Sequence, residues 1–308
     1  MFWLIETNKQ LEEFKSKEFK KVFIEPLFSN DNLHPFKRGV VAFYIREINY
    51  KKGFIINLNH SEATWCDLDK VYELIGGFEE IFVRDRKEFL HIVPLKQLSD
   101  IYFISPTDIP DPSPCHEFFY RKYPHIGNIG AIIPIVKQYE HYETVFNACR
   151  HIFTMDKPQH FNFYNNKATN VFWWIEQEGI KTNPLKFEEH FGVAHECAYT
   201  QFNLKTTTTR PSNSFGGINY AALDKKSGCR ESFIPSNDFL LEIDISAYHP
   251  TLAAQLVDYE FKEEDIHQAF ADMYGVDYKK AKELTFKQLY GGVFKEYKDL
   301  EFFKRVEA

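Results

Sequence analysis

The feature that most constrains this chain is a strand-to-helix junction carrying a single acid, Asp244. Before it, residues 239–243 form an apolar run after a turn-like Pro-Ser-Asn-Asp segment, which predicts a buried strand. After it, Pro250 suits the first turn of a helix. Asp244 is therefore expected at a strand's carboxyl end, where its carboxylate and the backbone carbonyl of Ile245 can bind Mg²⁺. The alternative is that Asp244 only caps the helix.

Composition predicts a globular protein of about two domains. Of the 308 residues, 44% are hydrophobic and 17% aromatic, unlike a disordered chain, and no apolar run is long enough to cross a bilayer. The five cysteines are odd in number and lack paired metal-type spacing, so we expect reduced thiols and a cytoplasmic protein, in the host cytoplasm if it is viral. The net charge of −7 argues against a general nucleic-acid coat but allows a local basic groove.

The first half of the chain predicts an α+β domain over residues 1–156. Its opening hairpin, Val-Val-Ala-Phe-Tyr then Gly-Phe-Ile-Ile-Asn-Leu-Asn-His, resembles the ribonuclease-H-like 3′–5′ exonuclease domain that precedes many replicative polymerase domains. That resemblance implies several carboxylates around two metal ions. Strands are expected at residues 40–47, 53–59, 80–83 and 102–105, and helices at residues 3–21, 87–98 and 130–153.

Two departures predict that this exonuclease-like domain is degenerate. The first strand reads Phe-Ile-Glu up to Glu25, so the first acid of the implied Asp-x-Glu is missing. Residues 85–89 also depart from the implied Asn-x-x-x-Asp. We expect a scaffold that kept the fold and lost the metals, and the alternative is a nuclease with unfamiliar ligands.

The segments after residue 160 carry more specific patterns. A helical pattern at residues 164–178 stops at Gly179 with the sequence Glu-Gln-Glu-Gly-Ile. The Thr-rich residues 206–213 and the Asn-Tyr-Ala-Ala of residues 219–222 follow. These segments resemble the start of the polymerase domain of family A DNA polymerases, the class of bacterial DNA polymerase I, with a reduced thumb.

The resemblance implies that part of this region follows the minor groove of primer–template DNA. The implied contacts are Arg210, Asn213 and Asn219, because arginine, amides and hydroxyls can bind phosphates and base edges without reading sequence. Thr209 stands in place of the family's glycine. The alternative interpretation is a plain Thr/Ser-rich linker.

Motif A of the same family is matched next. Arg-Glu-Ser-Phe-Ile-Pro, starting at Arg230, matches its lead, and Asp-Ile-Ser-Ala-Tyr-His, starting at Asp244, falls where the family has Asp-Tyr-Ser-Gln-Ile-Glu. The resemblance implies that Arg230 contacts DNA and that Asp244 and the carbonyl of Ile245 bind two Mg²⁺ ions. His249, in place of the usual glutamate, would exclude a ribose 2′-hydroxyl. His267 ends an Asp-Ile-His match and would contact the outgoing phosphates, unless it is merely a surface histidine.

The most specific pattern is residues 278–292, Tyr-Lys-Lys-Ala-Lys-Glu-Leu-Thr-Phe-Lys-Gln-Leu-Tyr-Gly-Gly. Residues four apart share one helix face, so Lys282, Phe286 and Tyr290 form a row. The pattern resembles motif B, which implies that these three meet the triphosphate, the sugar and base, and the template side. Since tyrosine stands at the motif's arginine position, Lys279 or the lysine after it would hold the γ-phosphate. An amphipathic helix without a ligand is the alternative.

Taken together, the resemblance implies an α/β protein in which an incomplete palm and fingers, residues 157–308, follow the exonuclease-like domain. Motif C, whose aspartate is the family's second metal carboxylate, has no match here. We therefore expect a split, phage-like DNA polymerase that binds primer–template DNA, dNTPs and Mg²⁺ and is inactive until a second polypeptide supplies motif C. Apolar residues between 293 and 303 are expected to lack cover and to join the partner interface at residues 286–306. The alternatives are a non-catalytic primer–template scaffold and a nuclease acting through residues 1–156.

Overall fold

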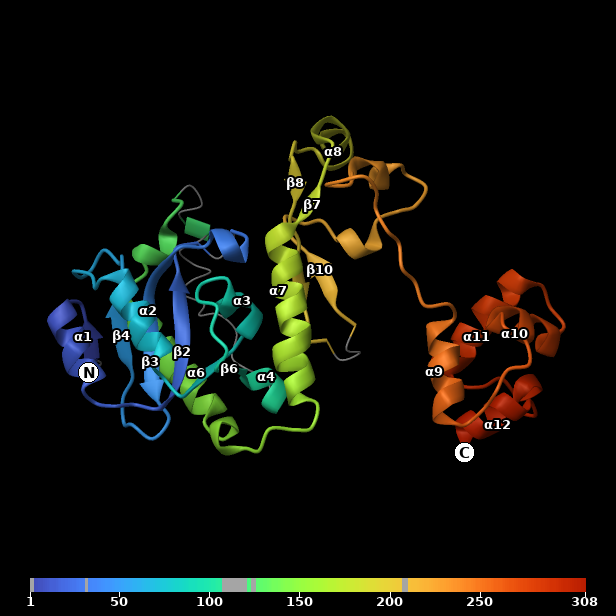
Figure 1. Ribbon diagram of the computed structural model, residues 1–308, viewed down its shortest axis with the longest axis horizontal. Coiled ribbons are helices and arrows are strands. Elements are labelled where there is room, and N and C mark those ends of the chain that lie inside the picture. Colours follow the sequence, from blue (N-terminus) through green and yellow to red (C-terminus); the bar gives the residue numbers. More distant parts are fainter. Residues whose placement is uncertain (1–2, 31–32, 107–120, 123–125, 207–209) are drawn as a thin grey trace. The chain divides into compact units, whose positions relative to one another are not determined.

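The computed structural model describes residues 3–30, 33–106, 121–122, 126–206 and 210–308 (Figure 1). They fall into two compact units, residues 1–239 and residues 240–308. The division expected at residue 156, between exonuclease-like and polymerase-like sequence, lies inside the first unit and stays a prediction. Within the described residues, no helix combines the length and the apolar character needed to span a membrane.

The strands of the first unit pair into one mixed sheet in the order β1-β4-β3-β2-β5-β6 (Figure 1). β2, β3 and β4 form an antiparallel meander, β5 and β6 continue parallel to β2, and β1 pairs parallel with β4. This arrangement confirms the expected α/β class. The strands are β1 (Trp3–Ile5), β2 (Lys21–Phe28), β3 (Val40–Glu47), β4 (Phe54–Asn57), β5 (Glu80–Val83) and β6 (Leu98–Asp100).

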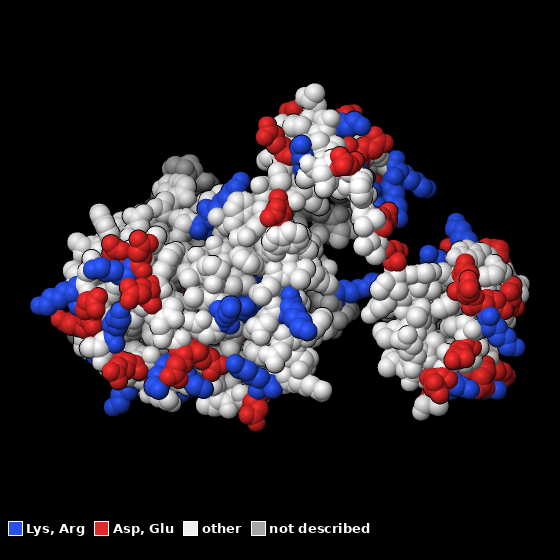
Figure 2. Space-filling model, in the orientation of Figure 1, with Lys and Arg blue, Asp and Glu red and all other residues white. Residues whose placement is uncertain are grey.

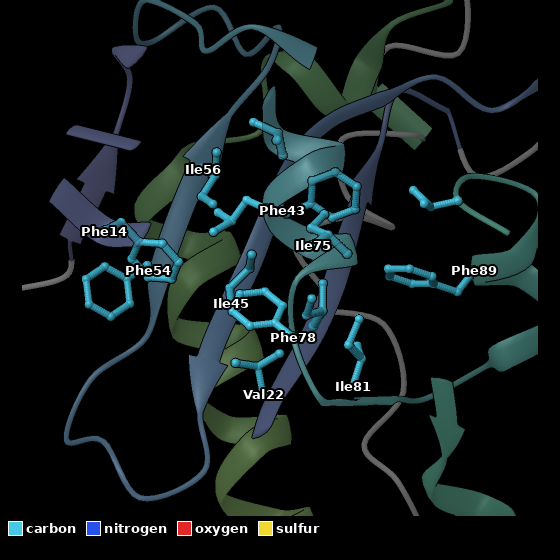
Figure 3. Packing of buried hydrophobic residues seen from close by; sticks show 14 of the residues in the cluster. Phe14, Val22, Phe43, Ile45, Phe54, Ile56, Ile75, Phe78, Ile81 and Phe89 are labelled. Atoms are coloured by element: carbon cyan, nitrogen blue, oxygen red, sulfur yellow. The ribbon is translucent and has the colours of Figure 1, made fainter. Parts of the chain in front are cut away.

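Helices cover both faces of this sheet, because alternate strand residues point to opposite faces and most of them are apolar. On one face, Phe43 packs in a buried cluster with Ile75 and Phe89 (Figure 3). On the other face, Phe23 meets Phe146, with ring centroids 5.9 Å apart. The helices of this part are α1 (Asn8–Lys15), α2 (Leu68–Gly76), α3 (Arg86–Leu90), α4 (Ile101–Ile104) and α6 (Ile135–Cys149).

Two expected helices are shorter in the structure. Trp3–Ile5, expected to start the first helix, is strand β1, because these residues find backbone partners on β4. The helix expected over residues 87–98 ends early as α3, since Pro94 cannot continue a helix and the chain then enters β6. Strands β3 and β5 have the expected bounds of residues 40–47 and 80–83.

The strand expected at residues 102–105 is wrong. Residues 101–104 form the short helix α4, because Asp100 caps it by accepting a hydrogen bond from the Tyr102 N–H at 3.0 Å. The helix expected over residues 130–153 is confirmed in its middle part as α6.

A helical arm leads into the second half of the sequence. The π-helical segment Phe163–Ala168 runs into α7 (Thr169–Glu178), which Gly179 ends with a φ of 65°. This confirms the helix expected at residues 164–178. A Cβ at position 179 would lie 2.6 Å from Cys197 Sγ, so the turn requires glycine. Short elements follow: β7 (Ile180–Lys181), α8 (Pro184–Phe191), β8 (Cys197–Ala198), β9 (Gln201–Asn203) and β10 (Ser212–Ser214).

The second unit is helical and has its own core. Phe270 lies 5.3 Å from Phe302 between ring centroids, and Phe302 and Phe303 are fully buried. The expectation that apolar residues between 293 and 303 lack cover is wrong for Phe302 and Phe303, because the last helix folds back onto this core. Val293, Tyr297 and Leu300 are partly buried against the same core, whereas Phe294 is 40% exposed. The helices are α9 (Tyr248–Leu256), α10 (Ile266–Tyr274), α11 (Tyr278–Gly291) and α12 (Glu301–Glu307).

Candidate functional site

Asp244 lies in an extended, solvent-exposed segment before α9. The strand expected at residues 239–243 is absent: Phe239, Leu241 and Ile243 are 71%, 73% and 83% exposed. No described strand pairs with this segment, so neither its backbone nor its apolar side chains are covered. The Asp244 Oδ1 accepts a hydrogen bond from the Ile245 N–H at 2.9 Å and does not cap α9, which begins after Ala247.

The donor set around Asp244 does not by itself fit a pair of Mg²⁺ ions. Mg²⁺ prefers octahedral coordination by hard oxygens, and two-metal centres need more than one carboxylate. Asp244 and Ile245 supply one carboxylate and one backbone carbonyl, and both residues are exposed. Among the described residues there is no group of three or more histidine, cysteine, aspartate or glutamate side chains that could hold a metal.

Three of the candidate substrate-binding side chains come together in the second unit. The ring of His249, on α9, lies 5.6 Å from that of Tyr290 and 6.2 Å from that of Phe286, both on α11. Phe286 and Tyr290 stack with centroids 6.3 Å apart. Lys282 lies one turn earlier on α11 and is exposed, as is Lys279. The four-residue spacing thus produces one face that combines aromatic rings with ammonium groups.

His267 joins this face from inside the unit. It is 4% exposed, and its ring packs 5.8 Å from Tyr278 and 6.3 Å from Phe286. Burial, assisted by the charge of Lys282, lowers the pKa of His267, so the imidazole is neutral at pH 7. The alternative of a surface histidine is therefore wrong, and its expected contact with phosphates stays a prediction.

The candidate DNA contacts all lie in the first unit. Asn213, on β10, accepts a hydrogen bond from the Ala221 N–H at 3.0 Å, and so braces the turn that Asn219 begins. Arg230 donates to the carbonyl of Leu223 at 2.9 Å. Asn213 and Arg230 thus shape this loop region through their side chains.

The remaining candidate in this region, Arg210, is exposed just before β10. Thr209, in the family's glycine position, lies outside the described residues together with its neighbours at 207 and 208. Figure 2 shows Lys and Arg interspersed with Asp and Glu over the visible face of each unit. On the face shown, a DNA contact through this region would therefore depend on a few placed residues rather than on a broad basic surface.

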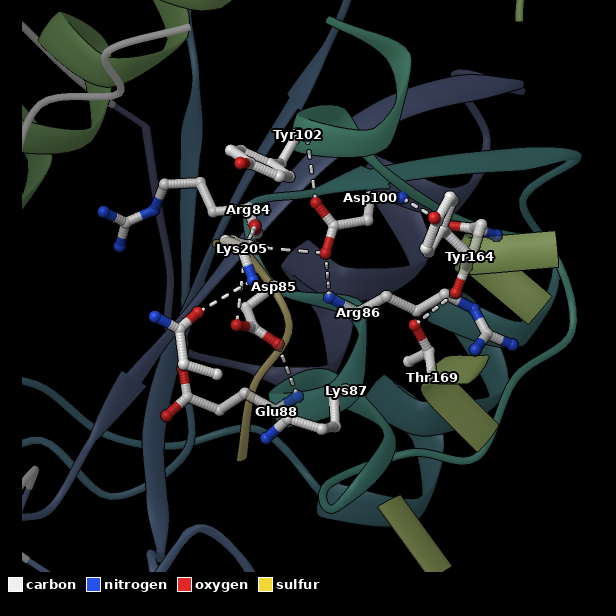
Figure 4. Close-up of polar contacts among 12 residues, drawn as sticks. Arg84, Asp85, Arg86, Lys87, Glu88, Asp100, Tyr102, Tyr164, Thr169 and Lys205 are labelled. Carbon is white, nitrogen blue, oxygen red and sulfur yellow. Dashed lines mark hydrogen bonds and ion pairs between the residues drawn. The ribbon is translucent and has the colours of Figure 1, made fainter. Parts of the chain in front are cut away.

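Several acids of the first unit pair with cations of the same chain. Arg84 Nε donates to Glu25 Oε1 at 2.7 Å. Lys205 Nζ lies 3.4 Å from Asp85 Oδ2 and 3.5 Å from Asp100 Oδ2 (Figure 4). The expected loss of metal ligands from residues 1–156 stays a prediction.

These charged groups shift one another's pKa values. Burial, with the charge of Asp85 and against that of Lys205, raises the pKa of Asp100 to about 6. Burial also tends to raise the pKa of Asp85, but the charges of Lys205 and Lys87 outweigh burial and lower this pKa to about 2. Lys205 stays charged, because the two carboxylates raise its pKa in spite of burial.

Sequence reasoning missed Asp100, Lys205 and Glu176. Glu176 is fully buried on α7, where Oε1 lies 2.7 Å from Lys87 Nζ and Oε2 lies 2.9 Å from His91 Nε2. A signal was present for Glu176, since an acid within the apolar run Val-Phe-Trp-Trp-Ile-Glu must find a partner when buried. No local pattern marks Lys205.

The sequence matches no known protein family and no curated protein. Among solved structures, the chain is similar to the POL domain of Pol1 from M. smegmatis, solved in complex with DNA primer-template and dNTP. The TM-score is 0.57 at 10% identity, over 99% of this chain and 74% of that chain. The chain is also similar to Escherichia coli RNase D, described as an exoribonuclease involved in structured RNA processing, with a TM-score of 0.28 at 11% identity over 61% of this chain and 57% of that one. The first of these similarities shows a polymerase-type fold.

Proposed function

We propose that this chain is part of a template-directed DNA polymerase of family A, which adds dNTPs to a primer 3′ end. The observation that carries the proposal is the clustering of His249, Phe286 and Tyr290 from two helices, with Lys282 exposed on the same helix as the last two. An arrangement of ammonium groups beside aromatic rings suits a nucleoside triphosphate, whose charged and planar parts need different partners. The polymerase-type fold supports this choice.

The proposed roles follow from exposure and chemistry. Lys282 and Lys279 would bind the triphosphate, because both ammonium groups reach solvent on α11. Phe286 and Tyr290 would contact the sugar, the base and the template side through their ring faces. His249 would limit the space beside the sugar, since its ring already packs against Tyr290.

DNA would be bound through the region around β9 and β10. Arg210 is the proposed phosphate ligand because its side chain is exposed and permanently charged. Asn213, Asn219 and Arg230 would shape the adjoining loop, whose backbone would then follow the DNA. Such contacts bind DNA without reading its sequence.

The second metal carboxylate is proposed to come from a second polypeptide carrying motif C. The exposed apolar segment at residues 239–243 supports this, because an uncovered strand-like run is a template for pairing with another chain. Pairing there would bring a second acid near Asp244 and complete a donor set for Mg²⁺. Asp244 and the Ile245 carbonyl are the ligands that this chain would contribute.

Two measurements on the purified chain test the proposal: anisotropy with a fluorescein-labelled hairpin primer–template, and extension of that primer with dNTPs and Mg²⁺. We expect weak DNA binding without extension by the chain alone, and extension when a polypeptide carrying motif C is added. Robust extension by the chain alone would overturn the need for a second polypeptide. Absence of DNA binding, alone or with that polypeptide, would overturn the polymerase assignment.

A second candidate is a non-catalytic primer–template binding subunit. One observation favours it: the described residues form no group of three or more histidine, cysteine, aspartate or glutamate side chains that could hold a metal. The two candidates differ in one outcome of the same experiment. DNA binding that never leads to extension, whichever polypeptide is added, would select the binding subunit.

A further inference from the structure

The ammonium group of Lys205 lies among oxygen atoms near the carboxyl ends of β5 and β6 (Figure 4). Asp85 follows β5 and Asp100 ends β6, and each places a carboxylate oxygen within 3.5 Å of Nζ. The same group donates a hydrogen bond to the backbone carbonyl of Arg84. Three oxygens from two neighbouring strands thus surround a single cation that belongs to the chain.

Lys205 occupies the place between these carboxylates that a divalent cation would need. Two carboxylates that face one group repel each other unless a cation lies between them. Asp100 is 1% exposed, so solvent does little to screen this repulsion, and the Lys205 side chain is 22% exposed. The two acids therefore hold a lysine ammonium group between them.

A second attachment fixes the same strand. The Phe202 N–H, in β9, donates to Glu176 Oε1 at 2.5 Å. The Phe202 ring lies 4.7 Å from Phe172 of α7. Glu176 in turn forms an ion pair with Lys87. The position of β9 is therefore fixed by two contacts, one through Phe202 within the strand and one through Lys205 just after it.

These attachments extend to β10 through backbone pairing. In the two-stranded ladder, Asn213 lies opposite Phe202 and Ser212 lies opposite Asn203. Thr206 Oγ1 also donates to the carbonyl of Arg210 at 2.8 Å. The position of Arg210 and Asn213 therefore depends on where β9 is held.

We propose that the carboxylates of Asp85 and Asp100, with the Arg84 carbonyl, form a binding site for the Lys205 ammonium group, here called the socket. We further propose that this socket positions the β9–β10 hairpin for primer–template DNA. Lys205 is thus a positioning residue, and the socket holds the hairpin against the rest of the first unit. The DNA part of this inference rests on the proposed function. The socket itself depends only on contacts within the first unit.

The experiment compares Lys205→Met, which keeps the aliphatic stem without the charge, with Lys205→Arg, which keeps the charge. Lys186→Met is the matched control, because Lys186 forms an exposed pair with Glu231 at 3.0 Å. Hydrogen exchange at residues 201–203 and 212–214 reports the hairpin, and anisotropy with the labelled hairpin primer–template reports DNA affinity. For Lys205→Met we expect exchange about tenfold faster at these strands alone and DNA binding about tenfold weaker. Lys205→Arg should retain most of the slow exchange at these strands and most of the DNA affinity. Lys186→Met should change neither the exchange nor the affinity.

Each outcome decides one part of the inference. Unchanged hairpin exchange in Lys205→Met would overturn the socket. Faster exchange with unchanged DNA affinity would overturn the positioning role. If the wild-type chain binds no DNA while exchange still rises, the proposed function fails and the socket stands. If Lys205→Met unfolds the whole unit, Asp85→Asn tests the same contact, because asparagine keeps the helix cap and removes one charge.

Discussion

Asp244, the proposed metal ligand, makes few contacts within the described part of the fold. Its carboxylate is exposed and its one hydrogen bond is to the next residue. In the complex of this chain with a polypeptide carrying motif C, we expect Asp244→Ala to reduce primer extension at least about tenfold, because a metal ligand is lost. Thermal unfolding of the chain should be unchanged, within about 0.5 kcal/mol. Extension that stays near the wild-type rate would show that Asp244 is not a metal ligand.

Glu176 is the opposite case, since the structure depends on it. The carboxylate is fully buried and accepts from Lys87, His91 and the Phe202 backbone. Glu176→Gln keeps the shape but leaves the Lys87 ammonium uncompensated, so we expect a loss of about 3–5 kcal/mol in urea unfolding. Glu231→Gln, at an exposed pair, should cost less than about 1 kcal/mol. Equal costs for the two variants would show that burial does not govern the Glu176 pair.

Asp85 predicts a particular dependence of stability on pH. Lys205 and Lys87, against the effect of burial, hold the pKa of Asp85 at about 2, below its ordinary value of 3.8. A lowered pKa means that the folded state releases the proton more readily, so this stabilisation is complete above about pH 4 and is lost as pH falls toward 2. Asp85→Asn should flatten the fall in urea midpoint across that window. If the urea midpoints of the variant and the wild type fell in parallel as pH decreases, Asp85 would not be the source of this pH dependence.

At the scale of elements, the sequence pattern predicted those helices whose bounds depend on nearby residues. The four-residue spacing gave α11 nearly its full length, and Gly179 marked the end of α7 because only glycine fits there. The strand expected at residues 239–243 failed for a different reason: apolar alternation shows what a strand would bury, but pairing needs a neighbour, and no described strand provides one. Strand β1 depends in the same way on β4.

The candidate site residues also separate into those that local spacing predicts and those that long-range contacts bring together. Phe286 and Tyr290 were expected on one helix face from their spacing, and their rings stack on α11. The contact of His249 with both rings comes from the packing of α9 on α11, which the spacing does not predict. The socket of Lys205 was not foreseen, because Asp100 and Lys205 are distant in the chain and neither stands in a recognisable pattern. Long-range ion pairs of this kind follow from the fold, whereas helix faces follow from spacing.

The exposed segment at residues 239–243 yields a prediction about one element. Because Ile243 is 83% exposed, Ile243→Ser should leave the unfolding free energy of the isolated chain unchanged within about 0.5 kcal/mol. Phe270→Ala, in the core of the second unit, should cost about 3–5 kcal/mol. A loss of several kcal/mol for Ile243→Ser would mean that the segment is buried in solution.

For the whole molecule, each unit has its own core, and the segment that joins them is a run of exposed apolar side chains. The sheet of the first unit is covered on both faces, and α9 to α12 enclose Phe270, Phe302 and Phe303 in the second. We therefore move the proposed partner surface from residues 286–306 to residues 239–245. This proposed surface includes Asp244, for which we propose a second carboxylate from the partner.

Hydrogen exchange of the isolated chain and of its complex with a motif C polypeptide tests this surface. In the isolated chain, amides at residues 302–303 should exchange slowly, because α12 is held in a buried core. Amides at residues 239–245 should exchange nearly as fast as an unstructured peptide, and at least about tenfold more slowly once a strand pairs with them. Slow exchange of residues 239–245 in the isolated chain would mean that another part of this chain already covers them. Fast exchange that persists in an active complex would place the partner elsewhere, and the exposed segment would no longer support a split enzyme.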